Sequence, residues 1–360
     1  MKKILCFIDN LGSGGAQRQM VNLAGIFKKH GYDVELLIYD ARNDFYLNQL
    51  KEKQIKFTCL QSRSYLQRLL TVTKYLRLSD ADVVIPFMET PCFLACLAKS
   101  LGAKWKLITN ERSAKESTFR GLKNKIYTFF ERFSDFKVCN SENAKGLWLR
   151  HKPQYSGKLK VIYNPVLMPA QNSIFISERE RLKIVVAASF QRLKNSVSVV
   201  KAIVLLPADL KDRLRIEWYG RKSVNGSTEV YDETSALILS NNLEKTVSLY
   251  DATPEIYSKM ATADAVGLFS TVEGLPNAVC EGMMLGKPIL MTRISDYNIL
   301  VDENGLLCDP NPQSIAEMLK QFIELSDSER LRMGKISKFK AINLFSEDVI
   351  SKQWIELIEN

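Results

Sequence analysis

Short apolar segments alternate with helical patterns twice along this 360-residue chain, and this alternation restricts the folds that it can adopt. In each half, strand-like runs are separated by stretches with apolar residues at helical spacing. Strands that alternate with helices form parallel sheets, because each crossover helix returns the chain to the same end of the sheet. The sequence therefore predicts an α/β fold with two doubly wound domains of ordinary size.

The predicted domain boundaries follow the strands and one polar stretch. In the first half we expect strands at 3–8, 34–38, 55–58, 83–86, 105–109 and 136–139, and in the second half at 183–188, 216–220, 247–250, 266–269 and 289–292. Residues 167–181 have the polar composition of a linker, so the domains are predicted at 1–166 and 182–343. The final segment, 344–360, contains an amphipathic helix over 346–359.

One acidic residue, Glu281, lies in a helix that is otherwise apolar. The helix is predicted from Asn277 to Leu285, before Gly286, and it should be buried because apolar residues surround its axis. A buried carboxylate costs several kcal/mol unless hydrogen bonds compensate it. The two hydroxyls of a ribose could supply those bonds. The alternative is an acidic residue near the helix start that interacts with the helix dipole.

The net charge differs strongly between the two halves. Residues 1–165 contain 28 Lys and Arg against 14 Asp and Glu, a net charge of +14, whereas the remainder contains 22 against 26, a net charge of −4. A basic N-terminal half favours an anionic partner, which could be nucleic acid, a phospholipid surface or a phosphorylated acceptor.

The rare residue types exclude several classes of site and protein. Seven scattered cysteines without a CxxC pair indicate a reducing cytoplasm and neither a zinc site nor a disulfide framework. Two histidines in the whole chain argue against Ser-His-Asp hydrolysis and histidine-rich metal sites. Asp9 interrupts the N-terminal apolar run too early for a signal peptide, and no apolar stretch approaches membrane-spanning length.

One basic and aromatic segment, Arg120 to Phe133, allows two interpretations. Five apolar residues recur at helical spacing, so we expect a helix that packs them into the core and exposes its basic side. They are Leu122, Ile126, Phe129, Phe130 and Phe133. The alternative is a helix that rests on an anionic membrane surface, with 62–74 as a second basic and apolar stretch.

A second carboxylate turns Glu281 into part of a recognisable pattern. Glu273 precedes it by eight residues and follows the strand at 266–269, at the sheet edge where α/β proteins bind ligands. The whole segment, EGLPNAVCEGMMLGKP over 273–288, resembles the donor-site signature of retaining glycosyltransferases of family 4. The resemblance implies the GT-B fold, in which two Rossmann-like domains face each other across a cleft and a C-terminal helix crosses back to the first domain.

The same resemblance assigns roles around this segment. It implies that Glu281 holds the ribose of a nucleotide and that Glu273 contacts the transferred sugar. The backbone N–H groups of the turn into the helix, at Gly274, Leu275, Pro276 and Asn277, would face the diphosphate, although proline itself has no N–H to offer.

Further matches lie elsewhere in the chain. The family's glycine-rich loop, which lines the cleft, corresponds to Gly14-Gly15-Ala16-Gln17-Arg18, after the first strand. Lys194 and Asn195 match the family's Lys-Asn pair, and Lys194 is expected to bind phosphate. The family's arginine falls on Ser189, so Arg192 is the only nearby arginine that could replace it.

The chain also departs from the family pattern at two places. Many members carry histidine where this chain has Asn110 and Glu111. One interpretation is that Glu111 and Arg112 contact the sugar or the leaving phosphate. The alternative is that they form a surface ion pair. The family's turn of small residues after strand 289–292 is replaced by 293–296, Arg-Ile-Ser-Asp, which leaves the sugar contacts open.

These observations together predict a retaining glycosyltransferase of cell-surface polysaccharide or glycoconjugate synthesis. It would move a hexosyl or N-acetylhexosaminyl group from a nucleotide-diphosphate sugar to a hydroxyl of a glycan or lipid-linked acceptor. We expect no metal, no other cofactor and no nucleic acid partner, and a cytoplasmic location at the inner face of the membrane. A nucleotide-sugar epimerase on the same fold is the alternative, since fold alone does not determine chemistry. A phosphorylase would need a longer chain, and a nucleic-acid binder would leave Glu281 unexplained.

Overall fold

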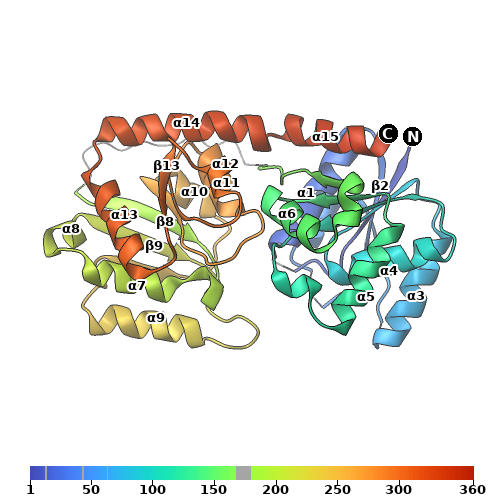
Figure 1. Cartoon of the computed structure of the whole chain (residues 1–360), viewed down its shortest axis with the longest axis horizontal. Helices are drawn as coiled ribbons and strands as arrows, with labels where there is room; N and C mark the ends of the chain where they lie inside the picture. Colours follow the sequence, from blue (N-terminus) through green and yellow to red (C-terminus); the bar gives the residue numbers. More distant parts are fainter. Residues whose placement is uncertain (13, 43, 63, 168–179) are drawn as a thin grey trace. The chain divides into compact units, whose positions relative to one another are not determined.

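The computed structural model describes residues 1–12, 14–42, 44–62, 64–167 and 180–360. The chain divides into two compact units, drawn in Figure 1. Unit 1 comprises Met1–Leu167 together with Glu347–Asn360, and unit 2 comprises Met168–Ser346. Most of the predicted linker, 168–179, lies outside the described residues.

Unit 1 is built on a seven-stranded parallel sheet with the order β3-β2-β1-β4-β5-β6-β7. Side chains of the central strand alternate between two cores, with Ile4 and Cys6 on one face and Leu5 and Phe7 on the other. Both faces are therefore covered, as parallel sheets require. The strands are β1 (Lys3–Phe7), β2 (Asp33–Ile38), β3 (Lys56–Cys59), β4 (Val83–Pro86), β5 (Lys106–Glu111), β6 (Phe136–Cys139) and β7 (Leu159–Val161).

The helices of unit 1 form a layer on each face of the sheet. On one face, α1 packs beside α15, where the rings of Phe27 and Trp354 meet edge to face at 6.0 Å between centroids. On the other face, α3 and α4 contribute Leu76 and Leu94 to the second core. The helices are α1 (Gly15–Lys29), α2 (Leu47–Glu52), α3 (Tyr65–Leu78), α4 (Glu89–Ser100), α5 (Leu122–Phe130), α6 (Glu142–His151) and α15 (Glu347–Glu359), with 3-10 turns η1 (Glu116–Phe119), η2 (Glu131–Phe133) and η3 (Pro153–Lys158).

Unit 2 repeats this architecture with six parallel strands in the order β10-β9-β8-β11-β12-β13. The strands are β8 (Leu182–Ala187), β9 (Leu214–Tyr219), β10 (Val247–Tyr250), β11 (Ala265–Leu268), β12 (Ile289–Thr292) and β13 (Gly305–Cys308). The helices are η4 (Arg192–Lys194), α7 (Ser196–Leu205), α8 (Ala208–Asp212), α9 (Glu229–Ser240), α10 (Ile256–Ala261), α11 (Asn277–Met284), α12 (Tyr297–Leu300), α13 (Pro312–Glu324) and α14 (Asp327–Phe345).

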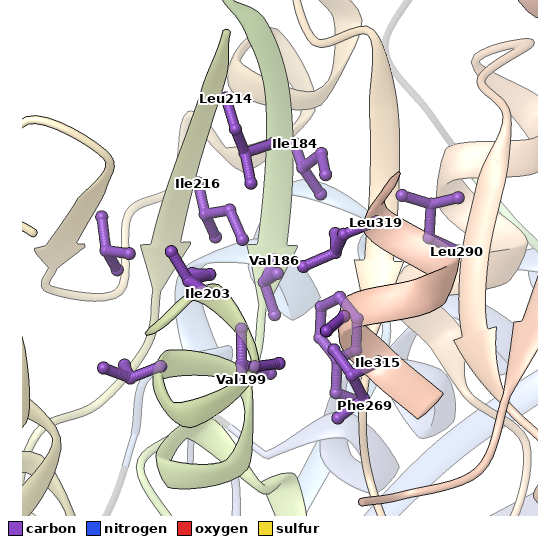
Figure 2. Close-up of a cluster of buried hydrophobic side chains, with 14 of the residues drawn as sticks. Ile184, Val186, Val199, Ile203, Leu214, Ile216, Phe269, Leu290, Ile315 and Leu319 are labelled. Atoms are coloured by element: carbon purple, nitrogen blue, oxygen red, sulfur yellow. The ribbon is translucent and has the colours of Figure 1, made fainter. Parts of the chain in front are cut away.

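One face of the unit 2 sheet carries a large aliphatic core. Figure 2 shows Ile184 and Val186 of β8 pointing toward Val199 and Ile203 of α7, with Ile315 and Leu319 of α13 beside them. On the other face, α11 approaches β11 closely, because a Cβ atom on Gly282 would lie only 2.8 Å from the side chain of Val266. The two parallel-sheet units confirm the predicted α/β fold class.

The structure corrects the prediction for 120–133. This segment is not one helix but α5 followed by η2, and three of the five residues expected in the core are exposed, whereas Phe130 and Phe133 pack against it. Leu122, Ile126 and Phe129 have exposed fractions of 77%, 43% and 48%. Tyr127 is buried instead and stacks on Phe93, with 4.3 Å between ring centroids. The strands β7 and β13 were not predicted.

Candidate functional site

Two loops of unit 2 meet where β8 and β11 end. Because these strands are parallel neighbours, their carboxyl ends lie at the same edge of the sheet, and the loop after each strand begins there. The backbone N–H of Thr271 donates to the carbonyl of Leu193 at 2.8 Å, which ties the loop after β11 to η4. The loops that carry Glu273 and Lys194 are thereby held together.

Lys194 and Glu273 form an ion pair at this edge. Their side chains are only 19% and 14% exposed, so most of the pair is removed from water. The same carboxylate accepts a hydrogen bond from Ser270 Oγ at 2.7 Å. Lys194 and Glu273 are therefore in direct contact although they lie far apart in the sequence.

Glu281 lies on α11 and is 5% exposed, so its predicted burial is confirmed. The neighbouring Cys280 is also buried, and burial together with the charge of Glu281 raises the pKa of its thiol well above its usual value. α11 begins at Asn277 directly after Pro276, and no side-chain hydrogen bond from the described residues caps this end. The start of a helix favours negative charge, so this end of α11 suits an anion.

The turn before α11 is supported from the next loop of the sheet. Ser295 Oγ donates to the carbonyl of Gly274, and Leu275 is buried. Ser295 has a φ of 56°, a left-handed conformation that is unusual for a residue other than glycine. The family's turn of small residues is thus replaced here by a serine that bonds the proposed donor loop.

The Arg192 side chain contacts α9 and not Glu273. Its guanidinium pairs with Glu229 at 2.5 Å and with Glu233, both on α9, and the side chain is 57% exposed. The structure therefore brings together Lys194 and Glu273, and it engages Arg192 in a separate surface network.

In unit 1, the glycine-rich turn leads into α1. Gly14 occupies the N-cap position and Gly15 begins the helix. Gln17 Nε2 donates to Asp9 at 3.2 Å, which links the first turn of α1 to the segment after β1. Burial raises the pKa of the Asp9 carboxyl.

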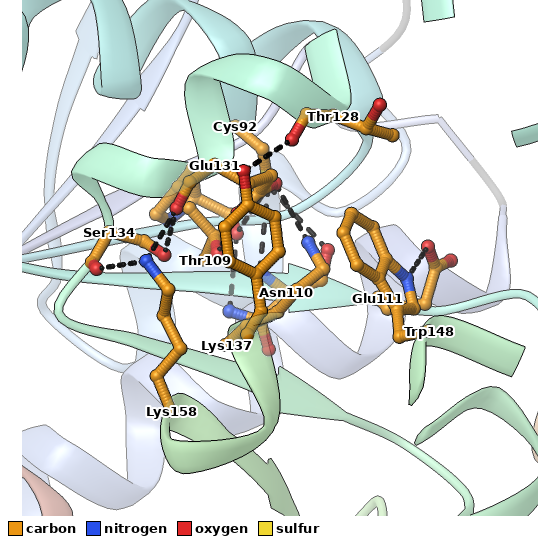
Figure 3. Close-up of polar contacts among 12 residues, drawn as sticks. Cys92, Thr109, Asn110, Glu111, Thr128, Glu131, Ser134, Lys137, Trp148 and Lys158 are labelled. Atoms are coloured by element: carbon orange, nitrogen blue, oxygen red, sulfur yellow. Dashed lines mark hydrogen bonds and ion pairs between the residues drawn. The ribbon is translucent and has the colours of Figure 1, made fainter. Parts of the chain in front are cut away.

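Glu111 and Arg112 lie where β5 ends, and the surface ion pair considered for them is wrong. Glu111 is buried and accepts a hydrogen bond from Trp148 Nε1 at 2.9 Å (Figure 3). It also accepts one from the backbone N–H of Ser113 at 2.9 Å. The guanidinium of Arg112 lies over the ring of Phe87, 4.0 Å from its centroid. Burial lowers the Arg112 pKa to about 9.

The sequence analysis missed a buried ion pair beside these residues. Lys137 of β6 pairs with Glu131 at 2.7 Å, and Thr109 Oγ1 donates to the same carboxylate at 2.6 Å (Figure 3). The side chains of the pair are only 3% and 8% exposed, and the nearby carboxylate raises the Lys137 pKa against the effect of burial. A lysine in the middle of the apolar strand FKVC was the available signal.

These residues line a cavity of about 460 Å³ within unit 1. The cavity lies beyond the carboxyl ends of β1, β4 and β5, and its wall includes Asp9, Asn110, Arg112 and Trp148. A parallel sheet places its ligand sites at this edge, so unit 1 has a candidate binding site of its own.

Two family models cover almost all of the chain. "Glycosyltransferase Family 4" matches residues 13–166, and "Glycosyl transferases group 1" matches residues 171–339. These matches do not support the epimerase alternative.

Two relatives from Campylobacter jejuni match along the full chain. One, named GalNAc-alpha-(1->4)-GalNAc-alpha-(1->3)-diNAcBac-PP-undecaprenol alpha-1,4-N-acetyl-D-galactosaminyltransferase, is 26% identical and covers 99% of this chain and 98% of that protein. The other, named N-acetylgalactosamine-N,N'-diacetylbacillosaminyl-diphospho-undecaprenol 4-alpha-N-acetylgalactosaminyltransferase, is 25% identical and covers 94% of each chain.

A solved structure shows the same fold. The Anabaena protein HepE in complex with UDP superposes with a TM-score of 0.84 over 100% of both chains, at 16% identity. With both sheets, both family models and the full-length relatives in agreement, this chain belongs to the family 4 type of glycosyltransferases, which have the GT-B fold.

Proposed function

We propose that this enzyme transfers a hexosyl or N-acetylhexosaminyl group from a nucleotide-diphosphate sugar to a hydroxyl of a lipid-linked glycan, with retention at the anomeric carbon. The observation that carries this proposal is the largely buried Lys194–Glu273 ion pair at the carboxyl edge of the unit 2 sheet. The names of the Campylobacter relatives, which act on undecaprenol-linked sugars, support the acceptor class. Synthesis of bacterial cell-surface glycoconjugates is the corresponding biological role.

In this proposal the charge of Lys194 is used during the reaction. A departing nucleoside diphosphate gains negative charge, and an ammonium group in a site with little water stabilises that charge strongly. Lys194 is already in place for this, and Glu273 lies next to it, where the sugar would be attached. Glu281, Gly274, Leu275, Pro276 and Asn277 would hold the nucleotide. The family resemblance assigns Gly14 and Gly15 to donor binding as well, and the proposed reaction requires no metal.

The test is a donor and acceptor screen with product analysis. The purified protein is incubated with UDP- and GDP-linked hexoses and N-acetylhexosamines, and with short undecaprenyl-diphosphate glycans. We expect one donor to give a product whose anomeric configuration, read from the proton coupling constant, matches the donor. An inverted product would disprove the retaining reaction, and a changed sugar nucleotide without transfer would favour epimerase chemistry.

We further propose that the protein binds the anionic inner face of the membrane through unit 1. No helix among the described residues is long and apolar enough to cross a bilayer. Large apolar side chains are nevertheless exposed along α3 and α5, which the hydroxyls of Tyr65 and Tyr127 join at 3.2 Å. We call this the α3–α5 surface; its exposed apolar residues are Tyr65, Leu66, Leu70, Leu122, Ile126 and Phe129.

Basic side chains surround these apolar residues. Lys123, Lys125 and Arg132 are exposed on or beside α5, and Lys74 is exposed on α3. Apolar side chains that enter the lipid interface, next to cations that meet lipid phosphates, are typical of reversible membrane attachment. Each basic residue contributes roughly 1 kcal/mol near an anionic surface.

Vesicle sedimentation tests this attachment. Reversal of Lys123, Lys125 and Arg132 to glutamate should weaken binding to anionic vesicles by about 100-fold or more, since about 3 kcal/mol of attraction is lost. Reversal of Lys51, Lys104 and Lys160, which are exposed elsewhere on unit 1, gives the same change in net charge and should have little effect. Equal losses in both triple variants would mean that net charge, and not this surface, determines binding.

A further inference from the structure

The wall of the unit 1 cavity includes the arginine Arg112. Among the described residues, no acceptor forms a hydrogen bond or ion pair with the Arg112 guanidinium, which lies over the Phe87 ring. Burial lowers its pKa to about 9, against the opposing effect of the nearby Glu111 charge. Arg112 is half-buried, and its guanidinium N–H groups, which no described residue accepts, are available to an anionic ligand.

The acidic residues of the cavity wall compensate the Arg112 charge only in part: Glu111 is near enough to raise the Arg112 pKa, but its hydrogen bonds go to other groups. Glu111 is bonded to Trp148 and Ser113. Glu131 is bonded to Lys137 and Thr109, and Asp9 is bonded to Gln17. The remaining wall carboxylate, Glu89, is exposed in the first turn of α4.

The backbone at the cavity wall supports a binding role. Met88 has φ 75° and ψ 158°, a conformation that is essentially restricted to glycine and costs about 1–3 kcal/mol. Such strain concentrates at ligand sites. Met88 also precedes α4, a 12-residue helix whose first residues line the cavity and whose N-terminus has no side-chain cap from the described residues. Its first N–H groups and Arg112 both favour negative charge.

The rest of the wall suits a sugar. Asn110 Nδ2 donates to the carbonyls of Pro86 and Ile108, while no described residue donates to its Oδ1. Aromatic rings of Tyr39, Phe93, Tyr127 and Trp148 also line the cavity. Apolar ring surfaces combined with a few directed polar atoms are the usual composition of a small-molecule site, and the volume of about 460 Å³ is in the usual range.

We propose that the unit 1 cavity binds a saccharide that carries an oxyanion, either a phosphate or a carboxylate, and that Arg112 holds this group through its two parallel N–H donors. The inference deepens the proposed function and rests on it for one point, namely that this saccharide is the acceptor. A guanidinium is the side chain best matched to either oxyanion, because its planar fork bonds two oxygens at once. Arg112 thereby selects charged over neutral acceptors.

The four tryptophans of the chain make this measurable by NMR. Trp148 lines the cavity, and its indole N–H bonds Glu111. The indole N–H of Trp218 bonds the Ala188 carbonyl in unit 2, and that of Trp105 bonds the Leu76 carbonyl elsewhere in unit 1. With ¹⁵N-labelled tryptophan in the full-length protein, each indole signal reports one location, and a Trp148→Phe variant assigns the reporter.

The titration uses glucose 1-phosphate, glucuronate and glucose, with UDP present at saturation to occupy unit 2. We expect at least one charged sugar to shift the Trp148 signal in a saturable way, with roughly 10-fold or tighter affinity than glucose. A response to the phosphate or to the carboxylate alone supports the proposal and identifies the oxyanion. Signals from Trp105 should not move.

Variants distinguish a specific contact by Arg112 from a general effect of positive charge on binding. Arg112→Gln should weaken the charged sugar roughly 10- to 100-fold, as expected for a lost charge-assisted hydrogen bond. The affinity of Arg112→Lys should lie between those of the parent and Arg112→Gln, because lysine keeps the charge but lacks the planar pair of N–H donors. Arg150→Gln is the matched control, since Arg150 is exposed and pairs with Glu116 at 3.3 Å.

Three results would overturn the proposal: no Trp148 shift with either charged sugar up to its solubility limit, a shift that persists unchanged in Arg112→Gln, or equal affinity for glucose. These outcomes concern binding in unit 1 alone. Glycosyl transfer is measured separately, so a failure here leaves the proposed reaction standing, and a failure of the reaction leaves this titration interpretable.

Discussion

Replacement of Glu273 by glutamine should make the enzyme bind nucleoside diphosphate more tightly while it transfers sugar more slowly. Lys194 is paired with Glu273 in the structure. The diphosphate must therefore compete with this carboxylate for the ammonium group. Glutamine keeps the shape and can still accept the hydrogen bond from Ser270, but it removes the competing charge.

The structure sets the size of the effect. Opposite unit charges about 4 Å apart attract by about 4 kcal/mol at an effective dielectric constant near 20. The side chains are 19% and 14% exposed, so solvent screens them only in part. Since the amide retains some of the interaction, we expect a gain of about 1.5–3 kcal/mol, roughly 10- to 100-fold in affinity.

Calorimetric titration with UDP, or with whichever nucleoside diphosphate binds best, measures this gain. The double variant Glu273→Gln with Lys194→Met should show no gain, because the competed cation is absent. Glu229→Gln is the control at the neighbouring network, since Glu229 pairs with Arg192. A gain in that control would assign Arg192 to the diphosphate as well. Unchanged or weaker binding by Glu273→Gln would refute the competition between Glu273 and the diphosphate.

Four further predictions concern single side chains. Glu281→Gln should weaken nucleotide binding, measured by calorimetry, without lowering the unfolding temperature, and unchanged affinity would exclude the ribose contact. Lys194→Ala should lower kcat more than it raises the KM of the donor, by about 2–4 kcal/mol of barrier, and a rate within a few-fold of the parent would contradict its phosphate role. Ser295→Ala should destabilise unit 2 by about 1 kcal/mol because the hydrogen bond to Gly274 is lost. Ser295→Gly should destabilise it less, because glycine tolerates the left-handed φ of 56°. Thermal unfolding measures both variants. Trp354→Ala should destabilise unit 1 by about 3–5 kcal/mol in denaturant unfolding, and the half-buried Ile355→Ala should cost clearly less.

The sequence was informative where local patterns determine the outcome. Apolar runs identified β8 and β11, and the apolar surroundings of Glu281 predicted its burial. β7 and β13 were missed; β7 contains only three residues, whereas β13 has four, as many as the predicted β11, so length alone does not explain the second omission. Nothing in the sequence indicated that these segments would pair with another strand.

Contacts between distant segments were beyond prediction from the sequence. Lys194 meets Glu273 because β8 lies beside β11, and strand order is a property of the assembled sheet. For α5, helical periodicity identified one apolar face but could not decide whether the core or the surface would receive it. Tyr127 stacks on Phe93, so its side of the helix is buried and Leu122 and Ile126 remain exposed.

The return of the chain into unit 1 has a consequence for biosynthesis. Unit 2 is one continuous segment, whereas α15 belongs to unit 1 and follows all of unit 2 in chain order. A ribosome therefore completes unit 2 before it supplies Ile350, Trp354 and Ile358 to the core of unit 1. Until then, the apolar side chains around Phe27 have no cover, and nascent unit 1 is a substrate for chaperones.

The same feature indicates how unit 1 could be produced alone. A fragment that ends at residue 167 would lack α15 and expose part of its core. The two ends of the described chain lie together, since Lys2 Nζ is 2.7 Å from Glu359 (Figure 1). A circular permutant that runs from 347–360 through a short linker into 1–167 would restore the complete core in one continuous polypeptide.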